Sequence, residues 1–212
     1  MENNMSIDFL NGLHIDVLKE IGNIGIGNAA SSLSAFLGKP VGMTVPEAKF
    51  LNFSEVGSIL GGDEAVVFGI LVGISGDING MMMFIIKPEA ARNLVDEFLI
   101  SLSGSSSGAG SEEFSEMDLS ALKEIGNILC SAYLGSLSSF IGLKITPTPP
   151  MIAQDMATSI LSVPATEFGK MSDGVLFIDT TFETDTDNTS GYFLLVPDIE
   201  SFKTILASLG VV

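Results

Sequence analysis

Hydrophobic and polar residues along the chain predict a long helix, three strands and a closing helix in its first half. Apolar residues at helical spacing predict a helix over about 16–37 that ends at Gly38. A short helical or irregular segment is expected after the first strand, and Pro88 is expected to begin the closing helix. The predicted strands are 41–50, 65–74 and 79–86, the last two joined by a turn at 75–78.

The second half repeats this order of elements. Its extended apolar segments GVLFIDTTFETD and GYFLLV predict two strands, separated by the turn DNTSG at 187–191. Pro197 is expected to begin the final helix, DIESFKTILASL. Both halves are therefore predicted to be α/β units of similar size.

An internal repeat explains this similarity. With a shift of 104 residues, the segment LKEIGNI at 18–24 recurs unchanged at 122–128. From 18 to 46, 14 of 29 positions are identical, whereas unrelated segments would share about two. The two halves are therefore copies of one ancestral unit.

The repeats suggest one shared domain, because a unit of this size with strands that are apolar on both faces would leave much of its sheet uncovered. Between them, nine of the eleven residues at 101–111 are Ser or Gly, as expected of a flexible tether. We therefore expect a single α/β domain of two pseudo-twofold-related repeats that share one sheet. The boundaries are repeat 1 at about 12–100, a Ser/Gly linker at 101–116 and repeat 2 at about 117–212.

Each long helix is expected to carry a polar stripe, since three polar residues fall within about 60° of one another on a helical wheel. These residues are Asp16, Glu20 and Asn23 in the first copy, and Ser120, Glu124 and Asn127 in the second. The Glu and Asn are identical in the two copies, while apolar neighbours such as Gly25 and Leu129 differ. The duplication has thus retained the polar pair.

Glycines within the first helix suggest a docking surface. Each costs about 1 kcal/mol relative to Ala, so a close contact should compensate. Gly22 and Gly25 lie on the face away from the stripe and are predicted to let another backbone pack closely. Gly27 lies beside the stripe and would leave room for a bulky partner.

Composition excludes several classes of function. Nine basic residues against 26 acidic ones, a net charge of −17, give no surface for nucleic acid or an anionic membrane. The longest apolar segments, at 66–74 and 81–86, are too short to span a bilayer. The N-terminus lacks the features of a secretory signal, so a cytoplasmic location is expected. A single cysteine, Cys130, and a single histidine, His14, exclude a structural zinc site and disfavour a Ser/His/Asp triad.

Glu and Asn one helical turn apart favour a narrow range of chemistry. They cannot form a nucleophile–base pair or the two carboxylates of a glycosidase. A carboxylate can bind a lysine, and a carboxamide can orient a water molecule. This combination suits hydrolysis of a phosphoryl group whose remaining machinery lies on another molecule.

The doubled signature [Asp/Ser]-x3-Glu-x2-Asn within LKEIGNI resembles that of the CheC/CheX/FliY family of chemotaxis phosphatases, and the two copies and chain length resemble the CheC type most. The resemblance implies a hydrolase of two-component signalling that acts on the aspartyl phosphate of the response regulator CheY. It assigns Asn23 and Asn127 to positioning the attacking water, and Glu20 and Glu124 to binding the regulator's lysine. It implies Mg²⁺ on the regulator, no cofactor on this chain, and the deamidase CheD as a second partner.

Two other interpretations remain open. The first is a non-catalytic adaptor that docks a response regulator or CheD through the same helix surface. The second is a nucleotide-dependent enzyme, based on the sequence Gly25-x-Gly27-x-x-Ala30. It is disfavoured because the preceding segment is helical in pattern and the second copy lacks both glycines. Asn28, replaced by Ala132 in the second copy, lies about 140° from Asn23 on the wheel and is expected to support packing rather than touch the phosphate.

Overall fold

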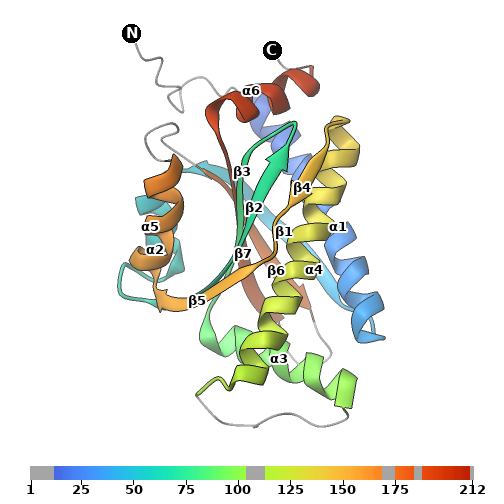
Figure 1. Cartoon of the computed structure of the whole chain (residues 1–212), viewed down its shortest axis with the longest axis vertical. Helices are drawn as coiled ribbons and strands as arrows, with labels where there is room; N and C mark the ends of the chain where they lie inside the picture. The colour runs from blue at the N-terminus through green and yellow to red at the C-terminus, as the bar shows by residue number, and fades with distance from the viewer. Residues whose placement is uncertain (1–11, 104–112, 169–174, 184–187, 211–212) are drawn as a thin grey trace.

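A seven-stranded antiparallel sheet lies between two pairs of helices in the computed structural model (Figure 1). The structure describes residues 12–103, 113–168, 175–183 and 188–210. The helices are α1 (Gly12–Leu37), α2 (Phe53–Leu60), α3 (Pro88–Ser103), α4 (Glu116–Ile141), α5 (Ala157–Phe168) and α6 (Ile199–Ser208). The strands are β1 (Gly42–Leu51), β2 (Val66–Gly76), β3 (Gly80–Ile86), β4 (Ile145–Pro147), β5 (Met151–Met156), β6 (Val175–Glu183) and β7 (Asn188–Pro197).

The two repeats share this sheet, as predicted. Its order is β1-β6-β7-β3-β2-β4, with β5 also pairing to β2. The central pair, β3 and β7, contributes one strand from each repeat. On either side, the first strand of one repeat pairs with a strand of the other: β1 with β6, and β4 and β5 with β2. Each half is therefore completed by the other.

Alternate side chains of the sheet enter two separate cores. On β3, Met82 and Phe84 point to the core beneath α1 and α4, whereas Met81 and Met83 point to the core with α2 and α5. Every residue from Met81 to Ile86 is buried. A strand that is buried on both faces explains the continuous apolar run in its sequence.

Glycine ends both long helices. Gly38 and Gly142 adopt left-handed φ angles of 66° and 68°, which terminate a helix at little cost only for glycine. The predicted end of α1 is thus confirmed. The predicted start at about residue 16 is wrong, because α1 begins at Gly12 and so includes His14.

The second half departs from prediction at its turns. Pro197 is the last residue of β7, and Asp198 is the N-cap of α6, its side chain accepting a 2.7 Å hydrogen bond from the Ser201 amide. The expected turn at 187–191 largely belongs to β7, which begins at Asn188; the preceding residues, 184–187, lie outside the described part. The strand equivalent to β1 is divided into β4 and β5, since three prolines at 147–150 cannot donate to a ladder.

The segment between the repeats is shorter than the predicted linker. Helix α3 continues through Ser103, and α4 begins at Glu116. Ser115 is the N-cap of α4 and forms a capping box with Asp118. Across the described residues, no helix is both long enough and apolar enough to cross a bilayer.

Candidate functional site

Helices α1 and α4 lie side by side and run in opposite directions against the same face of the sheet (Figure 1). Both bury a stripe of apolar residues on that face, including Ile21 and Ile26 of α1, and Ile125 and Leu129 of α4. Their opposite faces are exposed. The layer formed by these two helices therefore presents whatever lies on their outer faces to a partner.

The predicted polar residues lie on these outer faces. Glu20 and Asn23 are exposed on α1, and Glu124 is exposed on α4. Asn127 is partly buried, and Ser120 is exposed one turn before Glu124. Asp16 lies in α1, but its side chain falls outside the described part of the structure. Each Glu/Asn pair thus forms a compact, solvent-facing group on one helix.

The two Glu/Asn pairs are separate sites. Two contacts set the register of the antiparallel helices: Gly25 against Tyr133, and Asn28 with Ser136. On these registers, Asn127 lies level with Ser31 or with Leu37, which are 8 and 14 residues beyond Asn23 on α1. At about 1.5 Å per residue, the two pairs are about 12 to 21 Å apart along the helix axes.

A shallow groove of about 580 Å³ lies between the two helices, between the levels of the two pairs. Its lining consists mainly of small residues: Ile24, Asn28, Ser31, Ser32, Ala132, Gly135, Ser136, Ser139 and Phe140. The Asn28 amide (Nδ2) donates a 2.9 Å hydrogen bond to Ser136 Oγ, which in turn donates to the Ala132 carbonyl oxygen at 2.7 Å. Asn28 therefore supports the contact between the helices, as expected.

Gly25 accommodates a side chain rather than a backbone, so that prediction was wrong. A Cβ at Gly25 would lie 2.5 Å from Cδ2 of Tyr133, whose ring fills the space above the glycine. Under the 104-residue shift, the equivalent pair is Leu129 and Ala29, both fully buried. Gly25 has no side chain and faces the large ring of Tyr133, whereas Leu129 and Ala29 have side chains of intermediate and small size. The two equivalent pairs therefore have a similar total side-chain volume, but they divide it differently between their two residues.

The other two motif glycines behave differently. A Cβ at Gly22 would lie 3.8 Å from Cδ1 of Ile178, which is an ordinary van der Waals contact. A Cβ at Gly27 would meet nothing within 4 Å, so the surface beside Asn23 is open. This agrees with the predicted room for a partner at that position.

Two buried residues near the motif take no part in the exposed site. Burial raises the pKa of Cys130 to about 12, so the thiol stays protonated at neutral pH. Burial also raises the pKa of Tyr133, whose ring stacks on Phe193 at a centroid distance of 6.2 Å. Within the described residues, no cluster of His, Cys, Asp and Glu could hold a metal ion.

The glycine run does not form a nucleotide-binding turn. A dinucleotide fingerprint joins a strand to the start of a helix, but Gly25, Gly27 and Ala30 all lie in the middle of α1. The nucleotide interpretation is therefore wrong.

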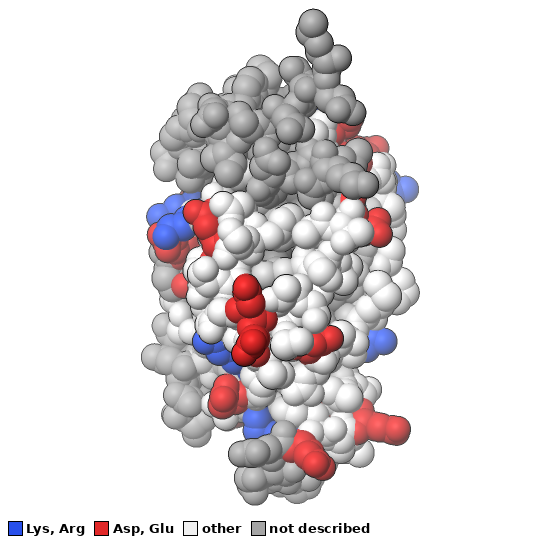
Figure 2. Space-filling view, turned by 90° about the vertical axis from the view of Figure 1, so that its left-hand side faces the viewer, with Lys and Arg blue, Asp and Glu red and all other residues white. Residues whose placement is uncertain are grey.

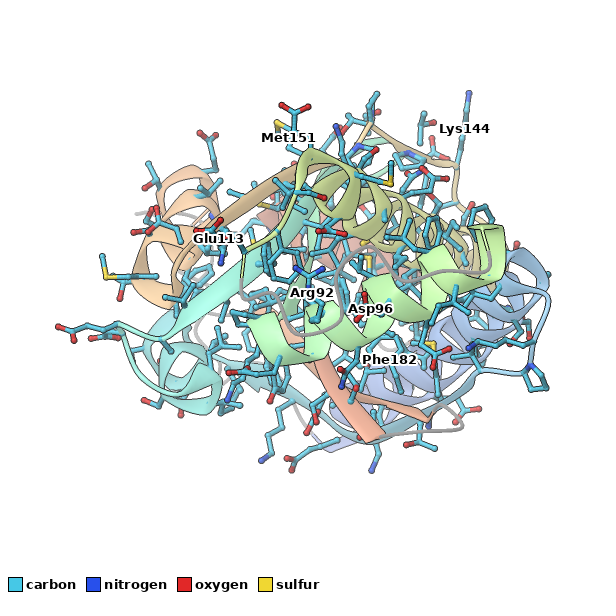
Figure 3. The ribbon with its side chains drawn as sticks, turned by 90° about the horizontal axis from the view of Figure 1, so that it is seen from below. Arg92, Asp96, Glu113, Lys144, Met151 and Phe182 are labelled. Carbon is cyan, nitrogen blue, oxygen red and sulfur yellow. The ribbon has the colours of Figure 1, made fainter. Side chains whose placement is uncertain are left out.

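An ion-pair cluster at the start of α4 was missed by sequence reasoning. Arg92 of α3 lies 3.2 Å (Nη1) from Asp118 Oδ2 and donates a 2.8 Å hydrogen bond from Nη2 to the Glu113 carbonyl oxygen. Its guanidinium also lies 4.0 Å from the ring centroid of Phe114. Figure 3 labels Arg92 on α3, beside Asp96 of the same helix. The cluster fixes the first turn of α4, two turns before Glu124. The Ser115-x-x-Asp118 spacing signals the cap, but nothing in the sequence assigns Arg92 to it.

Comparison with known proteins identifies relatives of both motif helices. A family model described as the CheC-like family matches residues 13–49 and 117–152. The chain is 30% identical to the CheY-P phosphatase CheC of Bacillus subtilis over 198 residues, 92% of this chain and 93% of that protein. It is 27% identical to the flagellar motor switch phosphatase FliY of the same organism over 146 residues, 69% of this chain and 37% of FliY.

Solved structures show the same fold. The crystal structure of Thermotoga maritima FliY matches with a TM-score of 0.75 at 23% identity, covering 95% of this chain and 98% of that one. The CheX-CheY-BeF3-Mg²⁺ complex from Borrelia burgdorferi matches with a TM-score of 0.51 at 17% identity, covering 85% and 97%. The arrangement of two helices over a shared sheet is therefore common to these proteins.

Proposed function

Because the chain belongs to the CheC-like family, we propose that it is a phosphatase that hydrolyses the aspartyl phosphate of a CheY-type response regulator. The observation that carries the proposal is the Glu/Asn pair, present twice without change on α1 and α4, with Glu20, Asn23 and Glu124 exposed and Asn127 partly buried. Both copies lie within the segments matched by the family model. The relatives named above include a CheY-P phosphatase and a complex with CheY.

Asn23 and Asn127 position the attacking water in this proposal. A carboxamide presents a donor and an acceptor in one plane, so it can hold a water molecule in a fixed orientation. The water oxygen forms a bond to phosphorus while the bond between phosphorus and the regulator's aspartate oxygen breaks. The products are inorganic phosphate and the free aspartate carboxylate. The contribution of the chain is positioning, which is effective for a loose phosphoryl-transfer transition state.

Glu20 and Glu124 bind the lysine of the regulator's active site. Each carboxylate lies one turn before its asparagine, so a lysine that is held by the glutamate fixes the phosphoryl group relative to the water. Mg²⁺ bound by the regulator would neutralise phosphoryl charge. Asp16 and Ser120 begin the polar stripe and are proposed to extend the contact surface towards the helix N-terminus.

Two further expectations follow from the family. Proteins of the CheC type are expected to bind the deamidase CheD, so CheD is proposed as a second partner that modulates activity. A CheY-type regulator works in the cytoplasm, and the phosphatase is proposed to act there too.

The test follows loss of the phosphoryl group from a purified phosphorylated CheY-type regulator. Wild-type chain should accelerate the loss, and Asn23→Ala/Asn127→Ala should reduce that acceleration by about 100-fold or more. Glu20→Ala/Glu124→Ala should weaken binding of the regulator. Asn79→Ala, which removes an exposed asparagine at the turn between β2 and β3, is the matched control.

Two outcomes separate the phosphatase from the adaptor. If wild-type chain binds the regulator but leaves its phosphoryl lifetime unchanged, the chain is an adaptor. If the double asparagine variant binds normally and no longer accelerates hydrolysis, water positioning is supported.

A further inference from the structure

Lysines that have no ion-pair partner among the described residues accompany both Glu/Asn pairs. The chain has only nine basic residues, and four of those described are held in ion pairs. These pairs are Lys39–Glu97, Lys49–Glu47, Arg92–Asp118 and Lys203–Glu200. Lys19 and Lys123 are exposed, and neither has an ion-pair partner within the described residues. Lys87 and Lys144 have no ion pair among the described residues either, so what distinguishes Lys19 and Lys123 is their repeated place beside the Glu/Asn pairs.

The position of these lysines on the helices is the same in both repeats. Each precedes its asparagine by four residues, which places it about 40° away on the same flank and one turn towards the N-terminus. The neighbouring glutamate is the next residue in the chain, about 100° away, so the two side chains of one helix do not face each other.

The environment of Lys123 lacks an internal partner. The residues three and four positions away are Leu119, Ser120, Gly126 and Asn127, none of which carries a charge. An intrahelical ion pair at the usual spacing is therefore impossible. An ion pair within the helix therefore does not account for Lys123. The same test does not apply to Lys19, because Asp16 lies three residues before it and the Asp16 side chain falls outside the described part of the structure.

The duplication has preserved the lysine while other exposed positions changed. Ser31 and Gly135 are equivalent exposed positions with different residues, as are Ala35 and Ser139. Lys19 and Lys123 are identical and equally solvent-facing. Because other exposed positions differ between the repeats, the identity of this exposed lysine in both indicates a role in contact with another molecule.

Overall charge gives that role a physical basis. The chain carries −17, and a phosphoryl group adds about −1.5 to −2 to its partner. Carboxylates are also spread over the side that carries α2 and α5, among few basic residues (Figure 2). A chain with this net charge and a phosphoryl group repel each other unless positive charge lies where they meet.

We propose that Lys19 and Lys123 dock the phosphorylated regulator by pairing with the carboxylates that surround its phosphoryl group. This inference rests on the proposed function and assigns the lysines to binding rather than to the chemical step. In each site, the lysine binds the acidic face of the regulator, the glutamate binds its lysine, and the asparagine orients the water. Charges of both signs then fix the register of the complex.

The test measures KM and kcat for phosphoryl loss with the full chain carrying Lys19→Ala/Lys123→Ala. The KM should rise about fivefold at low salt while kcat stays within about twofold. Lys→Glu at both positions should raise KM further, and Lys→Arg should stay within about twofold of wild type. Lys49→Ala is the control, because this exposed lysine on β1 faces the other side of the sheet.

Ionic strength provides a second measurement. The KM of wild type should rise with salt, and the double alanine variant should show a weaker dependence, since part of the screened attraction is already lost. An unchanged KM and salt dependence in the double variant would overturn the proposal. A fall in kcat at constant KM would also overturn it, because it would place the lysines in the chemical step.

A binding measurement distinguishes failure of the docking proposal from failure of the proposed phosphatase function. A regulator loaded with beryllofluoride and Mg²⁺ is titrated with wild type and with each lysine variant. Binding that weakens in the lysine variants, without any hydrolysis by wild type, rejects the phosphatase and supports the docking role. Hydrolysis and binding that both persist unchanged in the variants reject the docking role alone.

Discussion

Helices α1 and α4 are two versions of one segment, and they differ in which face has changed. Their outer faces carry identical Glu/Asn pairs. Between them, the contact of Gly25 with Tyr133 corresponds to Leu129 and Ala29 in the other copy. The inner faces had to conserve only volume, because a core tolerates rearranged side chains that fill the same space. Binding a partner imposes a stricter constraint, since each polar group must keep its own position.

The two helices also differ in how they are held. The first turn of α4 is fixed by its capping box and by Arg92. Near the other end of the layer, Phe36 of α1 stacks on Phe98 of α3 at 5.1 Å. Its repeat equivalent, Phe140, is 49% exposed and has no ring contact within the described residues. The second motif is thus anchored at its start and the first at its end.

The largest expected effect tests whether the Gly25/Tyr133 contact can be replaced by the Leu/Ala combination of the other repeat. Gly25→Leu should lower the free energy of unfolding by about 3 kcal/mol, because the new side chain overlaps the ring of Tyr133. Adding Tyr133→Ala recreates the arrangement found at Leu129 and Ala29, and should recover most of the loss. Urea unfolding of both single variants and of the double variant measures the coupling.

The outcome depends on whether the two substitutions compensate. Tyr133→Ala alone should cost about 3 kcal/mol through the cavity it leaves. A double variant as unstable as the sum of the two singles would contradict the exchange. Gly27→Leu is the control, since its Cβ meets nothing within 4 Å.

Removal of Arg92 should impair the second motif more than the first. Arg92→Ala leaves Asp118, which is only 3% exposed, without its guanidinium, and should cost about 2 to 3 kcal/mol of unfolding free energy. Phosphatase activity should fall more in an Asn23→Ala background, where only the second site works, than in an Asn127→Ala background. Equal losses in both backgrounds would show that the cluster does not act locally.

An exposed pair supplies the control for Arg92. Lys203→Ala breaks the ion pair with Glu200 on α6, and a pair of this kind contributes less than about 1 kcal/mol. Its effect on both stability and activity should be small.

Loss of Asn28 should make α1 more like α4. Asn28→Ala removes the 2.9 Å hydrogen bond to Ser136 and should lower stability by about 1 kcal/mol. Ser136 retains its bond to the Ala132 carbonyl oxygen, so no buried hydroxyl is left without a partner. Thermal or urea unfolding measures the loss, and phosphatase activity should be unchanged. A large loss of activity would place Asn28 in the site.

The smallest expected effect compares the two sites directly. Asn23→Ala and Asn127→Ala as single variants should each retain about half of the catalysed rate, because the two pairs are about 12 to 21 Å apart along the helix axes and are proposed to act separately. Single-turnover rates at saturating chain concentration measure the share of each site. Complete loss in either single variant would contradict independent sites.

Local signals in the sequence predicted much of this molecule. The end of α1 at Gly38 and the strands of the first half follow from short-range patterns, and the structure confirms them. The shared sheet followed from the size of each repeat. The exposed positions of Glu20 and Asn23 followed from helical spacing alone.

Contacts between distant segments could not be read from these patterns. Gly25 faces a ring that is 108 residues away, and nothing near Gly25 announces its partner. The pairing of β1 with β6 and the role of Arg92 depend on the assembled fold in the same way. Pro197 was predicted to begin the last helix, but it ends β7. Asp198 is the N-cap of α6 instead, because its side chain can accept a hydrogen bond from the first turn of the helix.

The exchange of edge strands between the repeats has a consequence during synthesis. Strand β1 emerges early from the ribosome, but its hydrogen-bonding partner is β6, which begins at Val175. Until most of the chain has been translated, the first repeat exposes unpaired strand edges of the kind that associate with other chains. A nascent chain of this protein therefore leaves β1 without its native partner until its last strands arrive.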